Sequence, residues 1–223
     1  MSRSELVRRY GIFTSGVIFA ALGIALITRA GLGTSAVSGL PYVCSLIFPA
    51  LSFGTFNFIF EILLFLGQAA LLGRAFSRVQ FLQLPANFVF SYCIDLWMWV
   101  LHFFIPEVLP YPVRLLLLLI GCVLLGFGVA LEVVADVLIL SYEGFVKALS
   151  QRFHRDFGHT ELVVDNTILV LAILTSFAGL GRLAGLREGT IIGTLIVGHI
   201  SGFFCRRLAP LTKRLCQSDA LAQ

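Results

Sequence analysis

Six apolar stretches dominate this chain, and each is long enough to cross a lipid bilayer as a helix. They lie near residues 10–30, 54–73, 81–104, 115–135, 162–178 and 189–205. A helix needs roughly 20 apolar residues to span the hydrocarbon core. Hydrophobic residues make up 58% of the chain and charged residues only 13%, whereas a soluble domain carries about 25% charged residues. The sequence therefore predicts an all-α integral membrane protein with six transmembrane helices in one membrane domain.

A seventh apolar segment, residues 37–50, is too short for a comfortable span and is interrupted by Pro41 and Pro49. Irregular backbone at membrane depth is tolerated only against protein or a cavity. We expect a short helix that enters the membrane and returns, although a full span stays open as the alternative.

The basic residues distinguish these two topologies, because cytoplasmic loops carry an excess of Lys and Arg. If residues 37–50 do not span, twelve of the sixteen basic residues share one side: Arg3, Arg8, Arg9, Arg74, Arg78, Lys147, Arg152, Arg155, Arg206, Arg207, Lys213 and Arg214. Only Arg29, Arg114, Arg182 and Arg187 face the other way. We therefore predict six spans with both termini, including a tail at 209–223, in the cytoplasm.

The two halves of the chain resemble each other when one is shifted by 105 residues. Eleven identities fall between residues 16–73 and their counterparts, against roughly four or five expected by chance. They include Gly16 with Gly121, Gly23 with Gly128 and Gly39 with Gly144. Each half, about 9–105 and about 113–208, holds three spans, so the second half enters the membrane from the opposite face. The sequence predicts an inverted repeat, with a short non-spanning helix after the first span of each half.

The second short helix should lie in the segment that follows the fourth span. Its apolar residues Tyr142, Phe145, Val146, Leu149 and Phe153 fall on one helical face, and basic residues lie largely elsewhere. This pattern is typical of a helix that lies at the membrane interface.

Several motifs resemble the YczE/YyaS/YitT-like group of bacterial membrane proteins, most closely its YczE branch. The first is GIALITRAGLGTSAVSGL at residues 23–40, which resembles a Gly-Leu-Gly-Thr-Ser signature after the first helix. The others are LSYEGF at 140–145 and REGTIIGTLIVGHISG at 187–202. The Pro and Arg that the branch carries near Glu143 are absent, which indicates a divergent member. The resemblance implies a multi-pass protein of the bacterial plasma (inner) membrane and supplies no reaction.

The glycine-rich stretch RAGLGTSAVSGL at residues 29–40 lacks the Lys and the preceding strand that a phosphate-binding loop requires. Its small residues instead predict a re-entrant loop that starts a short helix, with hydroxyl groups capping the helix or lining a solute path. The candidate residues of this loop are Gly31, Gly33, Thr34, Ser35, Ser38 and Gly39.

Polar residues inside apolar spans are costly and are candidates for function. Glu61 is the strongest of them, with Asn57 one turn earlier, and the shift by 105 residues matches it to Asn166. Asp95, Asn87 and His199 complete the candidate substrate or ion-binding set. Interhelical hydrogen bonding is the structural alternative for each. We expect Glu132 to be solvated at a helix end, and Gly189, Gly193, Gly198 and Gly202 to serve helix packing.

No pattern indicates an enzyme, a metal site or a cofactor. The sequence holds no HExxH or GxSxG motif and no CxxC pair, and its five cysteines suggest no disulfide framework. The net charge of +4 comes from residues that flank apolar runs, so membrane topology explains it better than nucleic-acid binding.

The leading functional hypothesis is a small-solute transporter, with proton coupling and the solute itself left open. The repeat, the short segment 37–50 and the intramembrane polar residues motivate it. The alternative is a non-transporting accessory or scaffold protein that supports a partner complex. Besides the bilayer, either a second copy or another membrane protein stays open as a partner.

Overall fold

The computed structural model describes residues 3–106 and 108–217, which form eight α-helices and no strand. Six helices are long and apolar enough to cross a membrane, as the sequence predicts. The spans begin several residues earlier than predicted in α1 and α7, and α8 continues as a helix to Gln217 through most of the predicted tail. Residues 218–223 of that tail lie outside the described residues.

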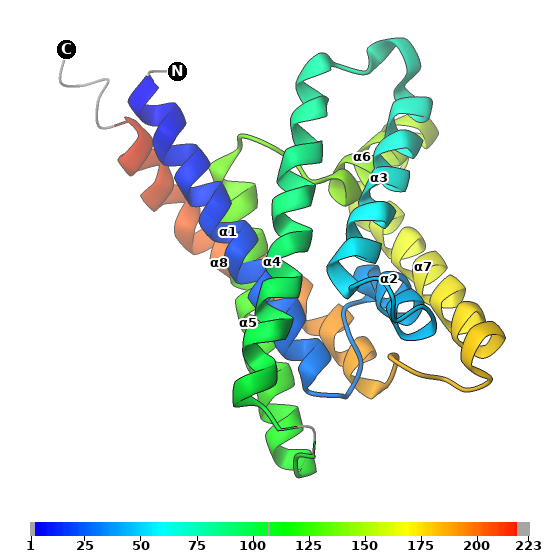
Figure 1. The fold of residues 1–223 in the computed structure, drawn as a ribbon. Helices are drawn as coiled ribbons and strands as arrows, with labels where there is room; N and C mark the ends of the chain where they lie inside the picture. The colour runs from blue at the N-terminus through cyan, green and yellow to red at the C-terminus, as the bar shows by residue number, and fades with distance from the viewer. Residues whose placement is uncertain (1–2, 107, 218–223) are drawn as a thin grey trace.

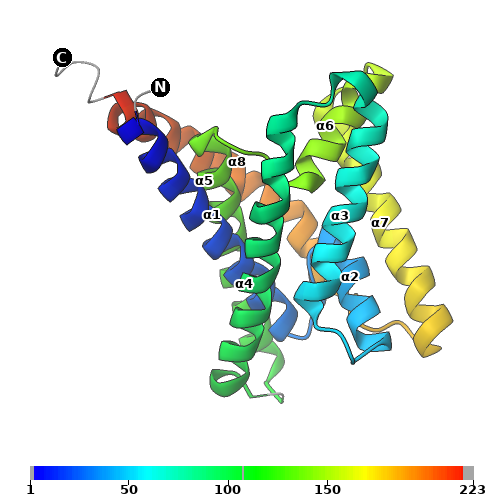
Figure 2. The same cartoon turned by 45° about the horizontal axis from the view of Figure 1, so that its top comes forward.

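The helices form two groups that lie side by side (Figures 1 and 2). The first group holds α1 (Arg3–Arg29), α4 (Gln83–Phe104), α5 (Tyr111–Ala135) and α8 (Glu188–Gln217), in which α5 packs between α1 and α8. The second group holds α2 (Ala36–Ile47), α3 (Phe53–Leu72), α6 (Ser141–Phe153) and α7 (Phe157–Leu180). Here α2 packs on α7 and α6 on α3. Two short 3₁₀ segments, η1 (Gly73–Ala75) and η2 (Arg78–Leu82), connect α3 to α4.

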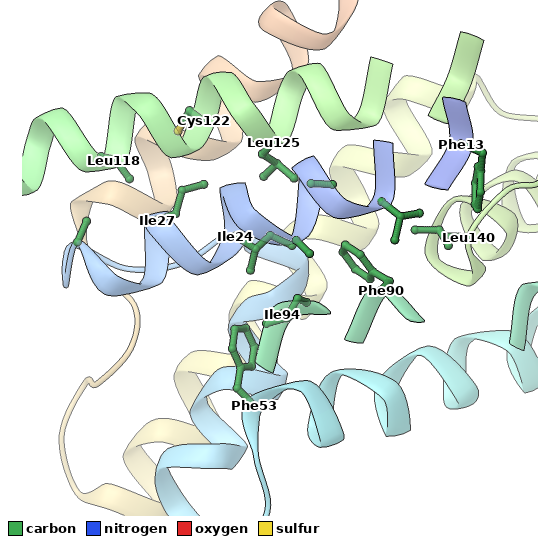
Figure 3. Close-up of a cluster of buried hydrophobic side chains, with 14 of the residues drawn as sticks. Phe13, Ile24, Ile27, Phe53, Phe90, Ile94, Leu118, Cys122, Leu125 and Leu140 are labelled. Atoms are coloured by element: carbon green, nitrogen blue, oxygen red, sulfur yellow. The ribbon is translucent and has the colours of Figure 1, made fainter. Parts of the chain in front are cut away.

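Glycines let α1 and α5 approach at backbone distance. A Cβ atom at Gly23 would lie 2.5 Å from the Leu125 backbone nitrogen, and one at Gly128 would lie 2.4 Å from that of Ala20. Around this contact Ile24, Ile27, Leu118 and Leu125 interdigitate, with Phe90 and Ile94 reaching in from α4 (Figure 3). Small residues that admit close backbone approach are the usual means of helix association in lipid.

Two short helices, α2 and α6, are too short to span. A helix of 12 or 13 residues is about 20 Å long, less than the roughly 30 Å of the hydrocarbon core. The α2 helix starts at Ser35, whose side chain accepts a hydrogen bond from the Ser38 N–H at 3.2 Å. The expectation of a short, non-spanning helix in segment 37–50 is therefore confirmed.

The α6 helix does not lie free at an interface. It packs between α3 and α7, with Tyr142 and Val146 buried, while Phe153 is 63% exposed at its end. In Figure 1, α6 lies at the end of the molecule where α1 begins and α8 ends, and α2 lies in the opposite half. We refer to these as the α6 end and the α2 end.

Candidate functional site

A central cavity of about 540 Å³ lies between the two helix groups, and all eight α-helices contribute to its lining. Helices α1, α4 and α5 of the first group contribute apolar lining residues: Ala20, Ile24, Ile27, Phe90, Leu125 and Val129. The lining from α2, α3, α6 and α7 carries most of the polar groups. Cavities of this size accept small organic ligands.

Five acidic side chains line the polar part of this cavity, and we call them the carboxyl cluster. They are Glu61 on α3, Glu132 on α5, Glu143 on α6, and Glu161 and Asp165 on α7. Glu61, Glu132 and Glu143 lie close enough for their charges to interact. The chain thus brings together acids that are up to 104 residues apart in sequence, from Glu61 to Asp165.

Three members of the carboxyl cluster have a buried oxygen without a hydrogen-bond partner in the described residues: Glu61, Glu132 and Glu143. Glu61 as a whole is only 2% exposed. A buried polar atom without a partner costs about 1–3 kcal/mol, so acids kept only for packing are normally hydrogen-bonded. All three residues also line the central cavity, so a small shift of their side chains would bring these oxygens to a ligand there.

Basic side chains do not neutralise the carboxyl cluster. Within the described residues no Lys or Arg forms an ion pair with it, and the ion pairs Arg9–Glu5 and Arg187–Glu188 lie elsewhere. Arg206 lines the edge of the cavity, but its Nε donates to the Gly202 carbonyl in its own helix. The cavity therefore carries an excess of acidic groups.

The first turn of α6 points its backbone N–H groups at this site. The N-cap residue Leu140 supplies no capping side chain, and groups from other helices take that place. The Ser141 N–H donates to Asn87 Oδ1 at 3.4 Å, and the Tyr142 N–H interacts with the Glu61 carboxyl. A helix N-terminus carries a partial positive charge that favours an anionic group. This turn therefore holds the Glu61 carboxyl in place.

Glu143 lies in the same turn of α6, outside the six spanning helices. Burial raises its pKa to about 7, and the charges of Glu161 and Asp165 act in the same direction. Its neighbour Tyr142 donates a hydrogen bond to Asp165 Oδ1, and burial together with that carboxylate raises the pKa of the phenol. Glu143 is thus able to exchange a proton near neutral pH.

A second cavity of about 820 Å³ adjoins the first toward the α6 end. Both are lined by Glu132, Glu143 and Glu161, and the second extends to η2 and to Lys147 and Gln151 on α6. The second cavity therefore lies between the central site and the α6 end of the molecule.

The α2 end is closed by tight contacts between the α1–α2 connection and the start of α8. The Gly189 N–H donates to the Leu32 carbonyl at 2.8 Å, and the Thr34 N–H donates to Thr190 Oγ at 3.2 Å. A Cβ atom at Gly33, where φ is +126°, would lie 2.3 Å from Thr190 Oγ. Only glycine fits this position.

Three of the predicted polar residues line the central cavity: Glu61, Asn57 and His199. The Asn57 side chain donates to Ser91 Oγ at 3.1 Å. His199 lies at the exposed edge, and its Nδ1 contacts the Leu195 carbonyl at 2.8 Å.

The other three predicted residues lie outside both cavities. Asn87 is buried and hydrogen-bonds Ser141, which fixes the start of α6. The Asp95 carboxylate accepts from the Gly54 N–H at 2.7 Å and from the Ser52 hydroxyl, and so caps α3. Asn166 is exposed and donates to the Leu162 carbonyl of its own helix, whereas its neighbour Asp165 lines the cavity.

The glycine-rich stretch divides into two parts. Gly31 and Gly33 have positive φ and form the turn, and Thr34 shares a hydrogen bond with Thr28. Ser35 and Ser38 follow at the start of α2 and line the central cavity. Gly39 lies deeper in α2, where an added Cβ atom would meet the Leu186 side chain at 2.9 Å.

Sequence reasoning missed most of the carboxyl cluster. It treated Glu132 as a solvated residue at a helix end, but its side chain faces the cavity and its Oε1 is buried. The four-residue spacing of Glu161 and Asp165 puts both on one face of α7 and was the signal available. Of the glycines in the last helix, Gly189 contacts Leu32 closely, whereas Gly198 and Gly202 line the cavity and have open space where a Cβ atom would lie.

Comparison with known proteins gives one family. No curated protein and no solved structure matches significantly. Residues 7–206, which include all eight helices in whole or part and the whole carboxyl cluster, match a family of unknown function, DUF6198. The chain belongs to this family, DUF6198.

Proposed function

We propose that this protein is a proton-coupled transporter of a small solute in the bacterial plasma membrane. The observation that carries the proposal is the central cavity, where buried carboxyl oxygens of Glu61, Glu132 and Glu143 have no partner among the described residues. Acids that serve only helix packing satisfy their oxygens. Groups left open to a cavity suit a solute or a proton.

An inverted repeat provides the usual architecture for alternating access. Under the shift by 105 residues α1 corresponds to α5, α2 to α6, α3 to α7 and α4 to α8. Three packing pairs then have counterparts, α1–α4 with α5–α8, α2–α7 with α6–α3, and α2–α8 with α6–α4, whereas α3–α4 has none. This reciprocity supports a two-fold relation between the halves.

The close glycine contacts between α1 and α5 also occur as a pair that the shift exchanges. Gly16 corresponds to Gly121 and Gly23 to Gly128 under the shift, and the contacts run crosswise, Gly16 to Gly128 and Gly23 to Gly121. Two copies of one surface related by a two-fold axis contact each other in this way. The α1–α5 contact would thus be the axis of the repeat.

The state of the cavity is consistent with one step of a transport cycle. A second cavity adjoins it toward the α6 end, and Gly33, Thr34 and Thr190 close it at the α2 end. The excess of Lys and Arg at the α6 end supports a cytoplasmic location for that end. The structure would then be an inward-facing state. Assignment to the YczE branch rests on sequence motifs and stays a prediction.

Transport by purified protein in liposomes tests the proposal. A panel of cationic, anionic and neutral solutes is offered with and without an imposed pH gradient, and flux is followed by currents or by a trapped pH dye. We expect flux of at least one solute to depend on the gradient and to be lost in Glu61→Gln. The matched control is Asp95→Asn, which changes an acid in a spanning helix outside the cavity and should retain flux.

The accessory or scaffold role makes the opposite prediction. A folded protein that moves no member of the panel, together with a Glu61→Gln variant that keeps its cellular function, overturns the transport proposal in favour of that role.

A further inference from the structure

We propose that the transported solute is an organic cation with an apolar body, and that it and protons bind the same carboxyl groups alternately. This inference rests on the proposed function and adds the chemical class of the solute and the mode of exchange. It is carried by three features of the central cavity, namely its charge, its apolar wall and its open side.

The charge of the cavity selects against anions. Glu61, Glu132 and Glu143 present unpartnered oxygens, and no ion pair with Lys or Arg offsets them in the described part of the chain. An anion would have to enter beside several acids, and like charges in a site of low dielectric repel strongly. A cation would satisfy the open oxygens and remove the cost of their burial.

The spacing of the acids suits a cation larger than a metal ion. Among the described residues no three His, Cys, Asp or Glu side chains converge closely enough to hold a metal. The same cavity, of about 540 Å³, is also lined by the apolar side chains Ile24, Ile27 and Leu125, which form its apolar wall. A solute with a charged group on one side and hydrocarbon on the other is complementary to both walls.

The cavity is open on the side between α7 and α8. These two helices are not a packing pair in the described residues, although their counterparts under the shift, α3 and α4, are. Leu162 on α7 and Leu195 on α8 line the cavity and are 56% and 64% exposed. Because both helices are spanning helices, this opening faces lipid hydrocarbon. An amphiphilic cation can enter from there, because its apolar body tolerates hydrocarbon.

Proton exchange follows from the surroundings of Glu143. Facing it are Glu61 on α3, Glu132 on α5, and Glu161 and Asp165 on α7. The basic groups in the lining of the two cavities are Lys147 on α6 and His199 and Arg206 on α8. Burial holds the pKa of Glu143 near 7, so a bound cation, which favours the ionised carboxylate, displaces the proton.

Equilibrium binding of a matched pair of ions to purified protein tests the inference. Tetraphenylphosphonium and tetraphenylborate have the same shape and apolar surface and opposite charge. We expect the cation to bind about tenfold or more tightly than the anion and to bind more tightly at about pH 8 than at about pH 6. In weak buffer near neutral pH, a pH dye should report protons released on cation binding.

Variants assign the effect to the cavity. Glu61→Gln should weaken cation binding by about tenfold or more, and Glu143→Gln should reduce proton release, while Asp95→Asn changes neither. Should Glu61→Gln fail to fold, protection of the wild-type carboxyl groups by the cation against a hydrophobic carbodiimide, read by mass spectrometry, gives the same assignment.

The outcomes separate this inference from the proposed function. Equal binding of both ions, no binding of the cation, or binding without proton release and without pH dependence overturns the inference. If a neutral or anionic solute is instead transported in liposomes, the proposed function stands without it. If the cation binds with proton release but no solute is transported, the transport proposal fails and the binding site stands.

Discussion

Glu61 and Asp95 are acids in neighbouring spanning helices, but their carboxyl groups have opposite surroundings. Both oxygens of Asp95 accept hydrogen bonds from the start of α3. Glu61 keeps one oxygen without a partner at the edge of a cavity. A satisfied carboxylate stabilises the fold, whereas an open one is available for binding. The two residues should therefore respond differently to substitution.

Replacing Asp95 with Ala should destabilise the protein without affecting the cavity. The change removes acceptors for the Gly54 N–H and the Ser52 hydroxyl, which should cost about 1–2 kcal/mol. We expect a lower melting temperature in detergent and unchanged affinity for tetraphenylphosphonium at a temperature where the variant is folded. A loss of affinity in the folded variant would assign Asp95 to the binding site.

Replacing Glu143 with Gln should flatten the pH dependence of stability. The pKa of Glu143 is about 7 in the folded protein and near 4.5 in an exposed carboxyl, so between these values the folded state binds more protons than the unfolded state. Stability therefore falls as pH rises through this range, by about 3 kcal/mol from this group. Melting curves between about pH 5 and about pH 8 should show a steeper decline in the wild type than in Glu143→Gln. Parallel curves would contradict this role.

The sequence identified Glu61 because a lone acid in an apolar span is conspicuous. It did not identify Glu132, Glu143 or Glu161, because these lie near helix ends, where solvation explains an acid equally well. Only the arrangement of helices brings them to one cavity. The sequence also could not show that Asp95 caps α3, because that contact depends on how α3 and α4 pack together.

At the scale of elements, the α1–α5 contact depends on four glycines that leave no room for a Cβ atom. Gly23 and Gly128 each face backbone atoms of the opposite helix, which cannot move aside as a flexible side chain can. The length and hydropathy of the helices were predictable from the sequence, because span length is set by the bilayer. The sequence could not predict which glycines lie at a helix contact, because Gly128 and Gly202 both occur within apolar runs.

This difference gives a matched pair of substitutions. Gly128→Ala should force α1 and α5 apart and destabilise the protein by about 1–3 kcal/mol. Gly202→Ala, whose new Cβ atom meets no other atom within 4 Å, should change stability little. The melting temperature of Gly128→Ala should be lower than that of Gly202→Ala in the same detergent. Equal values would show that α1 and α5 are not held at this distance.

At the scale of the whole molecule, two helix groups enclose a cavity that is sealed at one end. The α6 end holds the beginning of α1, the end of α8 and most of the basic residues, and the α4–α5 and α7–α8 connections lie at the other (Figure 1). The sequence could predict the number of spans. It could not predict how they divide into groups, because each group takes helices from both halves of the chain.

Thiol labelling tests the assignment of the two ends. In a variant without native cysteines, Ser77→Cys at the α6 end should react with a membrane-impermeant maleimide only after the cells are opened. Arg182→Cys, in the α7–α8 connection, should react in intact cells. Both positions are exposed. The reverse pattern would invert the protein in the membrane, and equal labelling of both in intact cells would contradict the six-span arrangement.

A cross-link at the α2 end tests whether that end must open. Thr34 and Thr190 are hydrogen-bonded neighbours in the closed contact. With native cysteines removed, Thr34→Cys combined with Thr190→Cys should form a disulfide on mild oxidation, abolish flux in liposomes and leave cation binding intact. Reduction should restore flux. Unchanged flux in the cross-linked protein would mean that the solute does not pass this end.

The starts of the two short helices are chemically unlike. Ser35 and Ser38 present hydroxyl groups at the start of α2, whereas the start of α6 presents Glu143 and holds the Glu61 carboxyl. A bound cation would therefore be held more tightly in whichever orientation brings it nearer the acids. Binding and reorientation form a closed thermodynamic cycle, so their free energies sum to zero. A difference in cation affinity between the two orientations therefore equals the difference between the reorientation free energies of the empty and the loaded protein. The contrast between two hydroxyl groups and two acids would thus influence which of the two orientations the empty protein prefers.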